Sequence, residues 1–181
     1  MTTTEAAISG RRRKATAMEF TILYGWHAIV SGAFIVAYLS GDEETYGMHQ
    51  FSGYLLLAAL CLRALAALLA PQGSPLRLRR PAFAPLISWG KSLLARPEPL
   101  PRRPLFASIA AALLAALAAA AATGAIADFA PFLEDGHEGL AEIALWIVLG
   151  HIAFVVALMA GTKLWRRVRT ALVPTLAEKR G

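Results

Sequence analysis

The amino-acid sequence predicts an all-α fold, an integral membrane bundle of four helices. Of the 181 residues, 57% are apolar and 17% are charged, which is more apolar than an ordinary soluble domain of this length. Four apolar stretches stand out, and a helix that crosses the hydrocarbon needs roughly 20 residues of this kind. Four crossings with their connections take up nearly the whole chain, so we expect residues 1–181 to form a single domain.

The first apolar stretch covers about residues 18–40 and follows a basic run from Arg11 to Lys14. A basic run before an apolar stretch is also typical of a secretory signal peptide. This stretch is longer than the apolar region of a signal peptide and lacks a small-residue cleavage site. We therefore expect it to remain in the protein as a transmembrane helix.

The other three apolar stretches cover about residues 50–70, 104–127 and 138–162, and each is long enough to span a bilayer with some tilt. The third helix is dominated by alanine and has no titratable side chain, which favours close backbone packing and a structural role. The connection before it is rich in proline and arginine. Its apolar part, about residues 83–95, is expected to lie along the cytoplasmic membrane surface, with an irregular loop as the alternative.

Lysine and arginine are concentrated before the first helix, between the second and third, and after the fourth. The other two loops have no lysine or arginine, and their charged residues are all acidic. Basic residues favour the cytoplasmic side, so both termini are expected in the cytoplasm of a bacterial inner membrane. The net charge of +6 comes from these basic segments, which are expected to lie beside the lipid headgroups of the membrane. No nucleic-acid partner is expected, because the basic residues are not part of a nucleic-acid-binding motif.

All four histidines lie in or at the edge of a predicted transmembrane helix: His27 in the first, His49 at the start of the second, and His137 and His151 in the fourth. Ionisable side chains are costly in hydrocarbon, so this concentration indicates a functional site. A separation of 14 residues puts His137 and His151 within about 40° of one helix face and roughly 21 Å apart along the axis.

Depth in the membrane sorts the histidines into two pairs. His27 and His151 each lie about a dozen residues from a cytoplasmic basic flank, which places both in the inner half at about 1.5 Å of rise per residue. His49 and His137 each follow an acidic loop and are expected near the outer face. The pairs His27 with His151 and His49 with His137 therefore join facing helices.

Two neutral imidazoles that approach from opposite sides suit the axial positions of a haem iron, and helix bundles commonly hold such sites. A structural zinc site would take four ligands close together. The lone Cys61 and the absence of a Cys-x-x-Cys-His stretch exclude covalent haem attachment. We expect two b haems between the helices; a haem-free protein whose histidines carry protons or bind a transition metal stays open as an alternative.

Two further residues are expected to contact haem. Gly53 lies four residues after His49 on the same helix face, where a missing side chain lets a flat ring approach, although simple helix packing explains it equally well. Arg63 is the only basic residue inside a predicted helix and lies near the depth of the inner pair. It is expected to neutralise a haem propionate, with snorkelling toward the inner surface as the alternative.

The sequence resembles the bacterial di-haem cytochrome b family, the four-helix b-561-type cytochromes related to the b-type cytochrome subunits of nickel-iron hydrogenases. The resemblance covers nearly the whole chain. It rests on Gly25-Trp26-His27-Ala28, on His49 to Tyr54 with the later Leu62-Arg63, and on His137 to His151. It implies that the four histidines are axial haem ligands. It also implies electron transfer between a quinone in the bilayer and a redox protein docked on one face.

One departure from that family concerns the partner. Hydrogenase-linked members often carry Gly-His-Asn-Pro before the third helix, where this chain has Pro101-Arg102-Arg103-Pro104-Leu105. We therefore expect a periplasmic c-type cytochrome or another oxidoreductase subunit as the partner, steered by the acidic outer loops. The alternative function is a haem-bearing membrane anchor subunit of an oxidoreductase such as a hydrogenase, without quinone activity of its own. Enzymatic activity and a homodimer with a second copy of the chain are left open.

Overall fold

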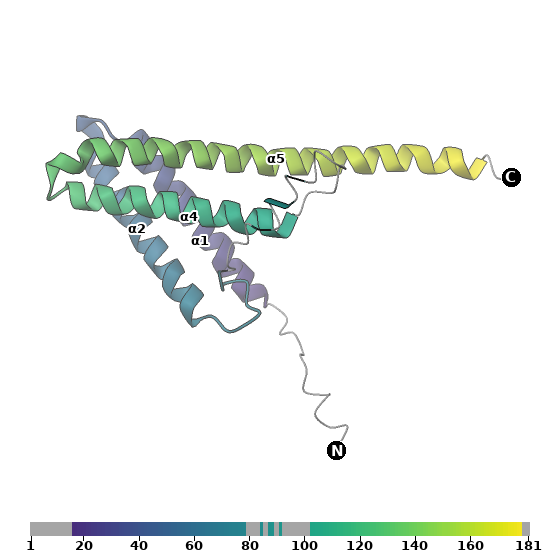
Figure 1. Cartoon of the computed structure of the whole chain (residues 1–181), viewed down its shortest axis with the longest axis horizontal. Coiled ribbons are helices and arrows are strands. Elements are labelled where there is room, and N and C mark those ends of the chain that lie inside the picture. Colours follow the sequence, from purple (N-terminus) through teal and green to yellow (C-terminus); the bar gives the residue numbers. More distant parts are fainter. Residues whose placement is uncertain (1–15, 79–83, 85–86, 89–90, 92–101, 179–181) are drawn as a thin grey trace, which may run out of the picture.

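The computed structural model describes residues 16–78, 84, 87–88, 91 and 102–178. Four long helices make up the fold (Figure 1): α1 (Ala17–Leu39), α2 (Tyr46–Leu69), α4 (Arg102–Ala127) and α5 (Glu134–Glu178). Short 3-10 turns, η2 (Glu43–Thr45) and η3 (Pro131–Leu133), lead into α2 and α5. No strand occurs among the described residues, and the predicted all-α fold class is confirmed. The predicted surface segment, about residues 83–95, lies outside the described residues except at isolated positions.

All four helices contain a stretch that is long and apolar enough to cross a membrane. Their outer faces carry many large apolar side chains that no other part of the described chain covers, among them Leu39, Phe51, Leu68 and Trp146. Because helices in a bilayer satisfy their own backbone hydrogen bonds, such faces can contact lipid directly. These properties fit a multi-pass membrane protein.

Two helices are longer than the apolar stretches that predicted them. Helix α2 begins at Tyr46 and α5 at Glu134, so that His49 and His137 both lie in the first turn of a helix. Helix α5 continues to Glu178, well past the apolar part that ends at Gly161. The residues after Gly161 include leucine, alanine and arginine, which favour a helix in water as well as in a membrane. Hydropathy therefore does not predict where α5 ends.

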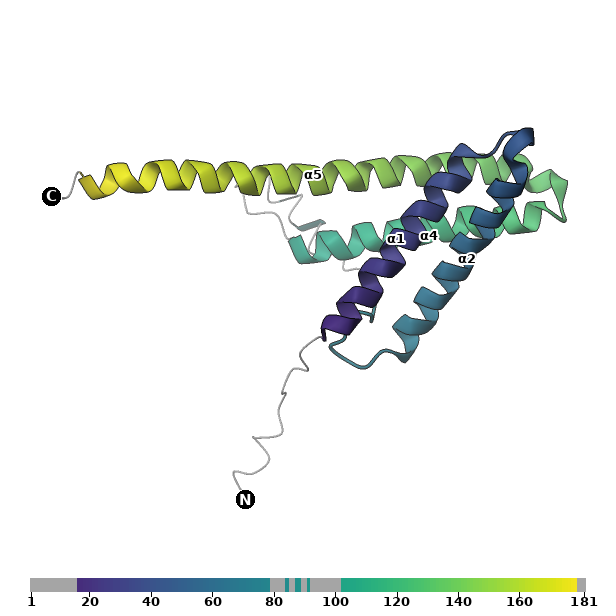
Figure 2. The ribbon, with the colours of Figure 1, turned by 180° about the vertical axis from the view of Figure 1, so that it is seen from behind.

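The helices are arranged as two hairpins, α1 with α2 and α4 with α5, which are joined by contacts between α2 and α4. Figures 1 and 2 show that the hairpins cross and that their two loops lie at the same end of the molecule. Among the described residues, α5 makes no extended contact with α1 or α2. Helix α5 therefore meets α1 and α2 through side chains where the hairpins cross, and not along its length.

A small apolar core lies where the hairpins cross. It is formed by Val30, Ala33 and Phe34 of α1, Leu56, Ala59 and Leu60 of α2, Leu117, Ala120 and Ala121 of α4, and Ala144 of α5. Ala144 is fully buried, at 0% exposure. It lies seven residues from both His137 and His151, so the three share one face of α5. The small side chain brings α5 onto the core midway between its two histidines.

Polar contacts hold the opposite end of the α1–α2 hairpin. Thr16 and Glu19 form a capping box at the start of α1. The Glu19 carboxylate also accepts a hydrogen bond of 2.6 Å from the hydroxyl of Ser74 in the chain that follows α2. This bond ties the beginning of the α2–α4 connection back to α1.

Candidate functional site

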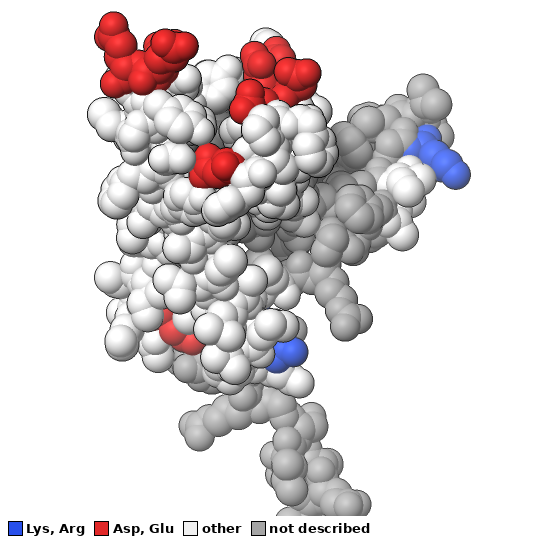
Figure 3. All heavy atoms as spheres, turned by 90° about the vertical axis from the view of Figure 1, so that its left-hand side faces the viewer, with Lys and Arg blue, Asp and Glu red and all other residues white. Residues whose placement is uncertain are grey.

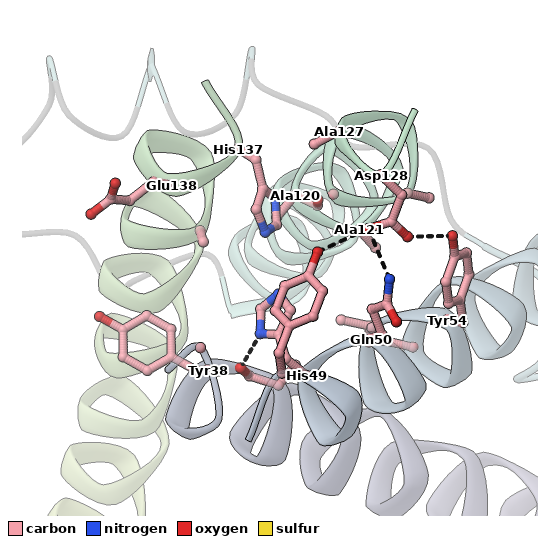
Figure 4. A pocket seen from close by; sticks show the side chains of 18 of the residues that line it. Tyr38, His49, Gln50, Tyr54, Ala120, Ala121, Ala127, Asp128, His137 and Glu138 are labelled. Carbon is pink, nitrogen blue, oxygen red and sulfur yellow. Dashed lines mark hydrogen bonds between the residues drawn. The ribbon is translucent and has the colours of Figure 1, made fainter. Parts of the chain in front are cut away.

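The imidazole rings of His49 on α2 and His137 on α5 meet near the loop end of the molecule. Their ring centroids lie 5.9 Å apart and their planes are inclined at 74° (Figure 4). Both histidines are half-buried. Two residues 88 positions apart in the sequence (137 minus 49) are thus brought together by the crossing of the two hairpins.

Each of these two rings hydrogen-bonds a backbone carbonyl of a neighbouring helix through Nδ1. For His49 the acceptor is the carbonyl of Ala37 on α1 at 2.7 Å, and for His137 it is the carbonyl of Ala120 on α4 at 3.0 Å. A carbonyl oxygen only accepts, so Nδ1 carries the hydrogen and Nε2 of the neutral ring keeps its lone pair. Histidines that bind a metal through one nitrogen commonly donate from the other in this way.

A pocket of about 970 Å³ surrounds the two rings. Its wall includes residues from all four helices: Phe34 and Ala37 of α1, Gly53 and Leu56 of α2, Ala121 and Gly124 of α4, and Glu138, Ala141 and Glu142 of α5. A Cβ atom built on Gly53 meets no other atom within 4 Å. The predicted contact residue Gly53 therefore faces open space in the pocket wall, and its role toward haem stays a prediction.

Helix α4, for which the sequence predicted only a structural role, contacts His137 closely. A Cβ atom on Gly124 would lie 2.8 Å from Cε1 of His137, so only glycine leaves room for the ring at this position. The Thr123 hydroxyl lies 3.5 Å from Nδ1 of the same ring. Sequence reasoning missed these residues; the one available signal was that Thr123-Gly124 interrupts a long run of alanine.

Asp128, which follows α4 directly, forms a second polar cluster on the pocket wall. Its carboxylate accepts hydrogen bonds from the Tyr54 hydroxyl at 2.6 Å, the Tyr46 hydroxyl at 3.1 Å and the Gln50 amide at 3.2 Å (Figure 4). The Tyr54 hydroxyl is the largest of the contributions that hold the pKa of Asp128 below its ordinary value. The cluster ties α2 to the α4–α5 loop and fixes that loop next to the two histidines.

The inner pair, His27 and His151, differs from the outer pair in its hydrogen bonds. Nδ1 of His151 is buried and has no hydrogen-bond partner within the described part of the chain. His27, on α1, is exposed and has Nδ1 3.3 Å from the hydroxyl of Ser31. The two histidines lie within electrostatic reach of each other. A buried imidazole nitrogen without a hydrogen-bond partner is uncommon.

Arg63 lies in the interior and is only 7% exposed. Its guanidinium donates a hydrogen bond to the carbonyl of Leu76 and lies 5.5 Å from the ring centroid of Trp26. Trp26 immediately precedes His27 on α1, so Arg63 lies at the level of His27 along that helix. A guanidinium has five N–H donors, and Arg63 uses one of them for the Leu76 carbonyl. The predicted contact of Arg63 with a haem propionate stays a prediction.

The spacing of the outer pair fits a single metal ion between two imidazoles. A metal–nitrogen bond of about 2.0–2.1 Å, with about 1.1 Å more to each ring centre, gives a centroid separation of roughly 6.3 Å. The observed 5.9 Å is close to that value. The tautomers of both rings and the open pocket beside Gly53 fit haem as well.

Comparison of the chain with protein-family models, with curated proteins and with solved structures finds no match.

Proposed function

We propose that this protein is a di-haem b-type cytochrome of a bacterial inner membrane, which transfers electrons between the quinone pool and a periplasmic redox partner. The observation that carries the proposal is the His49–His137 pair, with ring centroids 5.9 Å apart and both Nδ1 atoms hydrogen-bonded to backbone carbonyls. Haem, when bound, supplies one-electron redox chemistry, and the protein supplies binding, orientation and environment.

The four histidines divide into two binding sites. His49 and His137 hold the outer haem, and their Nδ1–H donation to Ala37 and Ala120 fixes the tautomer in which Nε2 faces the metal and makes each ring a stronger ligand. His27 and His151 would hold the inner haem, one from α1 and one from α5.

The core layer around Ala144 lies between the two sites. Ala144 is on the same face of α5 as both ligands and packs with Val30, Phe34 and Leu56. A dry apolar layer keeps water away from the space between the sites. It also fixes their separation, since α5 provides one ligand to each.

The orientation and the partner follow from the distribution of charge. Figure 3 shows acidic side chains gathered at one end of the visible face, and the two hairpin loops at that end include Asp42, Glu43 and Asp128. By the positive-inside rule this end faces the periplasm and both termini face the cytoplasm. An acidic surface favours a basic partner such as a c-type cytochrome.

A dithionite-minus-oxidised optical spectrum of the purified chain, with pyridine haemochrome quantification, tests the haem assignment. The wild type is expected to hold two b haems per chain. His49→Ala and His137→Ala should each lose one haem, and the double variant should lose no more than either alone. Met48→Ala, at an exposed neighbouring position, is the matched control and should keep both. Absence of b haem from the wild type would overturn the proposal in favour of a haem-free protein.

Quinone activity is tested in liposomes that contain the purified protein, with a water-soluble quinol analogue as donor and a c-type cytochrome as acceptor. The proposal predicts cytochrome reduction that depends on the protein and is lost in His49→Ala. A wild type that holds two haems but does not oxidise quinol on its own would instead support the membrane anchor function.

A further inference from the structure

Between Leu105 and Ala127 helix α4 has no titratable side chain, yet it contacts one ring of the outer pair, that of His137. A Cβ atom on Gly124 would lie 2.8 Å from Cε1 of His137 and 3.2 Å from both ring nitrogens. An ordinary van der Waals contact begins at 3.4 Å, so a methyl group there would require the ring to move by about 0.6 Å (3.4 minus 2.8). Binding geometries of this kind tolerate displacements of about 0.5 Å.

The same segment of α4 holds the other side of the His137 ring. The Ala120 carbonyl accepts the Nδ1–H of His137 at 3.0 Å. The Thr123 hydroxyl lies 2.8 Å from the Ala119 carbonyl and 3.0 Å from the Ala120 carbonyl, so its single hydrogen is shared between these two acceptors. The share that goes to Ala120 competes with His137 for that carbonyl. The Thr123 oxygen itself is 3.5 Å from Nδ1, which is too long for a strong hydrogen bond.

We propose that residues 120–124 of α4 position His137 as a haem ligand and set its strength. Gly124 provides the space that lets the ring reach the metal, and Thr123 moderates the hydrogen bond to Ala120 that makes the ring basic. Both are positioning residues, since they act through His137. The inference rests on the proposed function, because it concerns a ligand of the outer haem.

The first variant is Gly124→Ala, with Gly139→Ala as the matched control. Gly139 lies on α5 two residues after His137, does not line the pocket, and has no atom within 4 Å of its Cβ position. Alanine in place of glycine otherwise favours a helix, so loss of folding is not expected in either variant. Gly124→Ala should lose at least half of the outer haem, or shift its low-spin EPR signal, while the inner haem is unchanged. Gly139→Ala should match the wild type.

The second variant, Thr123→Val, keeps the shape of the side chain and removes the competing hydroxyl. His137 then no longer shares the Ala120 carbonyl with this hydroxyl, the ring becomes a stronger ligand, and the ferric form is favoured. We expect the reduction equilibrium of the outer haem to change by about threefold, which lowers its midpoint potential by roughly 28 mV, since tenfold is 59 mV for one electron. The potential of the inner haem should stay the same.

The outcomes separate the two proposals. A wild type without haem overturns the proposed function and with it this inference. A wild type with two haems, whose Gly124→Ala and Thr123→Val variants keep the content, EPR signal and potential of the outer haem, overturns the inference alone. If Gly124→Ala loses both haems, the potential measured on Thr123→Val decides.

Discussion

The ring of His49 lies 5.9 Å from the ring of His137, and the backbone carbonyls of Ala37 and Ala120 accept a hydrogen bond from one ring each. Two helices, α2 and α5, thus provide the rings, and the other two, α1 and α4, provide the groups that orient them. A displacement of any one helix would change the geometry of the pair. The crossing of the two hairpins is therefore part of the site.

The orientation of the two rings predicts an EPR property. Their planes are inclined at 74°, and axial imidazoles with nearly perpendicular planes give ferric haem a strongly anisotropic low-spin signal. We expect this signal for the outer haem in low-temperature EPR of the oxidised protein. His27→Ala, which removes an inner ligand, assigns the signal because only the outer haem remains. A rhombic signal of the kind that parallel planes give would contradict the observed ring orientation.

The open space beside Gly53 in the pocket wall leads to a prediction for a larger side chain at this position. Leucine at this position projects into the pocket, where a Cβ atom meets nothing within 4 Å, and occupies space that the ring of the outer haem requires. Gly53→Leu should fold, because no protein atom obstructs the side chain, but should lose most of one of the two haems in a pyridine haemochrome measurement.

Gly139→Leu is the control for the Gly53 variant, since it adds the same side chain at a position of α5 that does not line the pocket. It should retain two haems. Equal haem content in both leucine variants would show that Gly53 does not face the haem and only permits helix packing.

Much of the fold follows from hydropathy, because the bilayer imposes one length and one secondary structure on each crossing. The four helices were predicted within a few residues at most ends. The exception is the end of α5 at Glu178, where charged but helix-forming residues continue the helix without a change that hydropathy detects. Histidine spacing predicted the pair His49 and His137, whose ring centroids lie 5.9 Å apart.

The groups that orient the histidines could not be predicted from sequence. Every residue has a backbone carbonyl, so nothing in the sequence marks those of Ala37 and Ala120 as the acceptors for the two histidines. The same holds for the Asp128 cluster, whose donors on α2 lie 74 to 82 residues away in sequence. Such contacts depend on the angle between the hairpins, which a pattern of apolar residues does not specify.

The Asp128 cluster predicts how stability depends on pH. Hydrogen bonds, above all from the Tyr54 hydroxyl, hold the pKa of Asp128 below its ordinary value, which is about 3.9 in an unfolded chain. A depressed pKa means that the carboxylate contributes stability above the unfolded pKa and loses it as the pH falls through the folded pKa. We expect the Tm of the wild type to fall as the pH is lowered from about 5 to about 3, and Asp128→Asn to reduce that fall.

Asp42→Asn is the control for Asp128→Asn, because Asp42 lies in the other hairpin loop and its side chain makes no capping hydrogen bond. Its Tm should follow the wild-type pH profile. Identical profiles for Asp128→Asn and the wild type would show that the three donors do not stabilise the fold through the charged carboxylate.

Arg63 predicts a change at the inner haem. Removing its positive charge from the neighbourhood of a propionate favours the oxidised form, so Arg63→Met should lower the midpoint potential of the inner haem, whereas Arg63→Lys should retain most of it. Both lose the contact with Trp26 in part, and Arg63→Met also loses the bond to Leu76. The free energy of unfolding of the Arg63→Met variant should fall by about 2–3 kcal/mol. An unchanged potential with lowered stability would leave Arg63 a structural residue only.

The acidic loop end predicts a salt-dependent partner reaction. Glu43 and Glu134 lie at the rim of the pocket, one in each hairpin loop region, and both are exposed. Their charges attract a basic partner before contact, and this attraction is screened over about 8 Å at physiological ionic strength. Stopped-flow measurement should give an association rate with a basic c-type cytochrome that falls as salt rises. The double variant Glu43→Gln with Glu134→Gln should lower it by about tenfold at low salt.

Glu178→Gln, at the far end of α5, removes a charge of the same kind from the opposite end of the molecule and should leave the association rate unchanged. If the partner docks at the acidic end, the double variant loses both rate and salt dependence, because the steering charges lie where the partner arrives. If Glu178→Gln lowers the rate instead, the partner docks near the far end of α5. A rate that is independent of salt in the wild type would exclude electrostatic steering at either end.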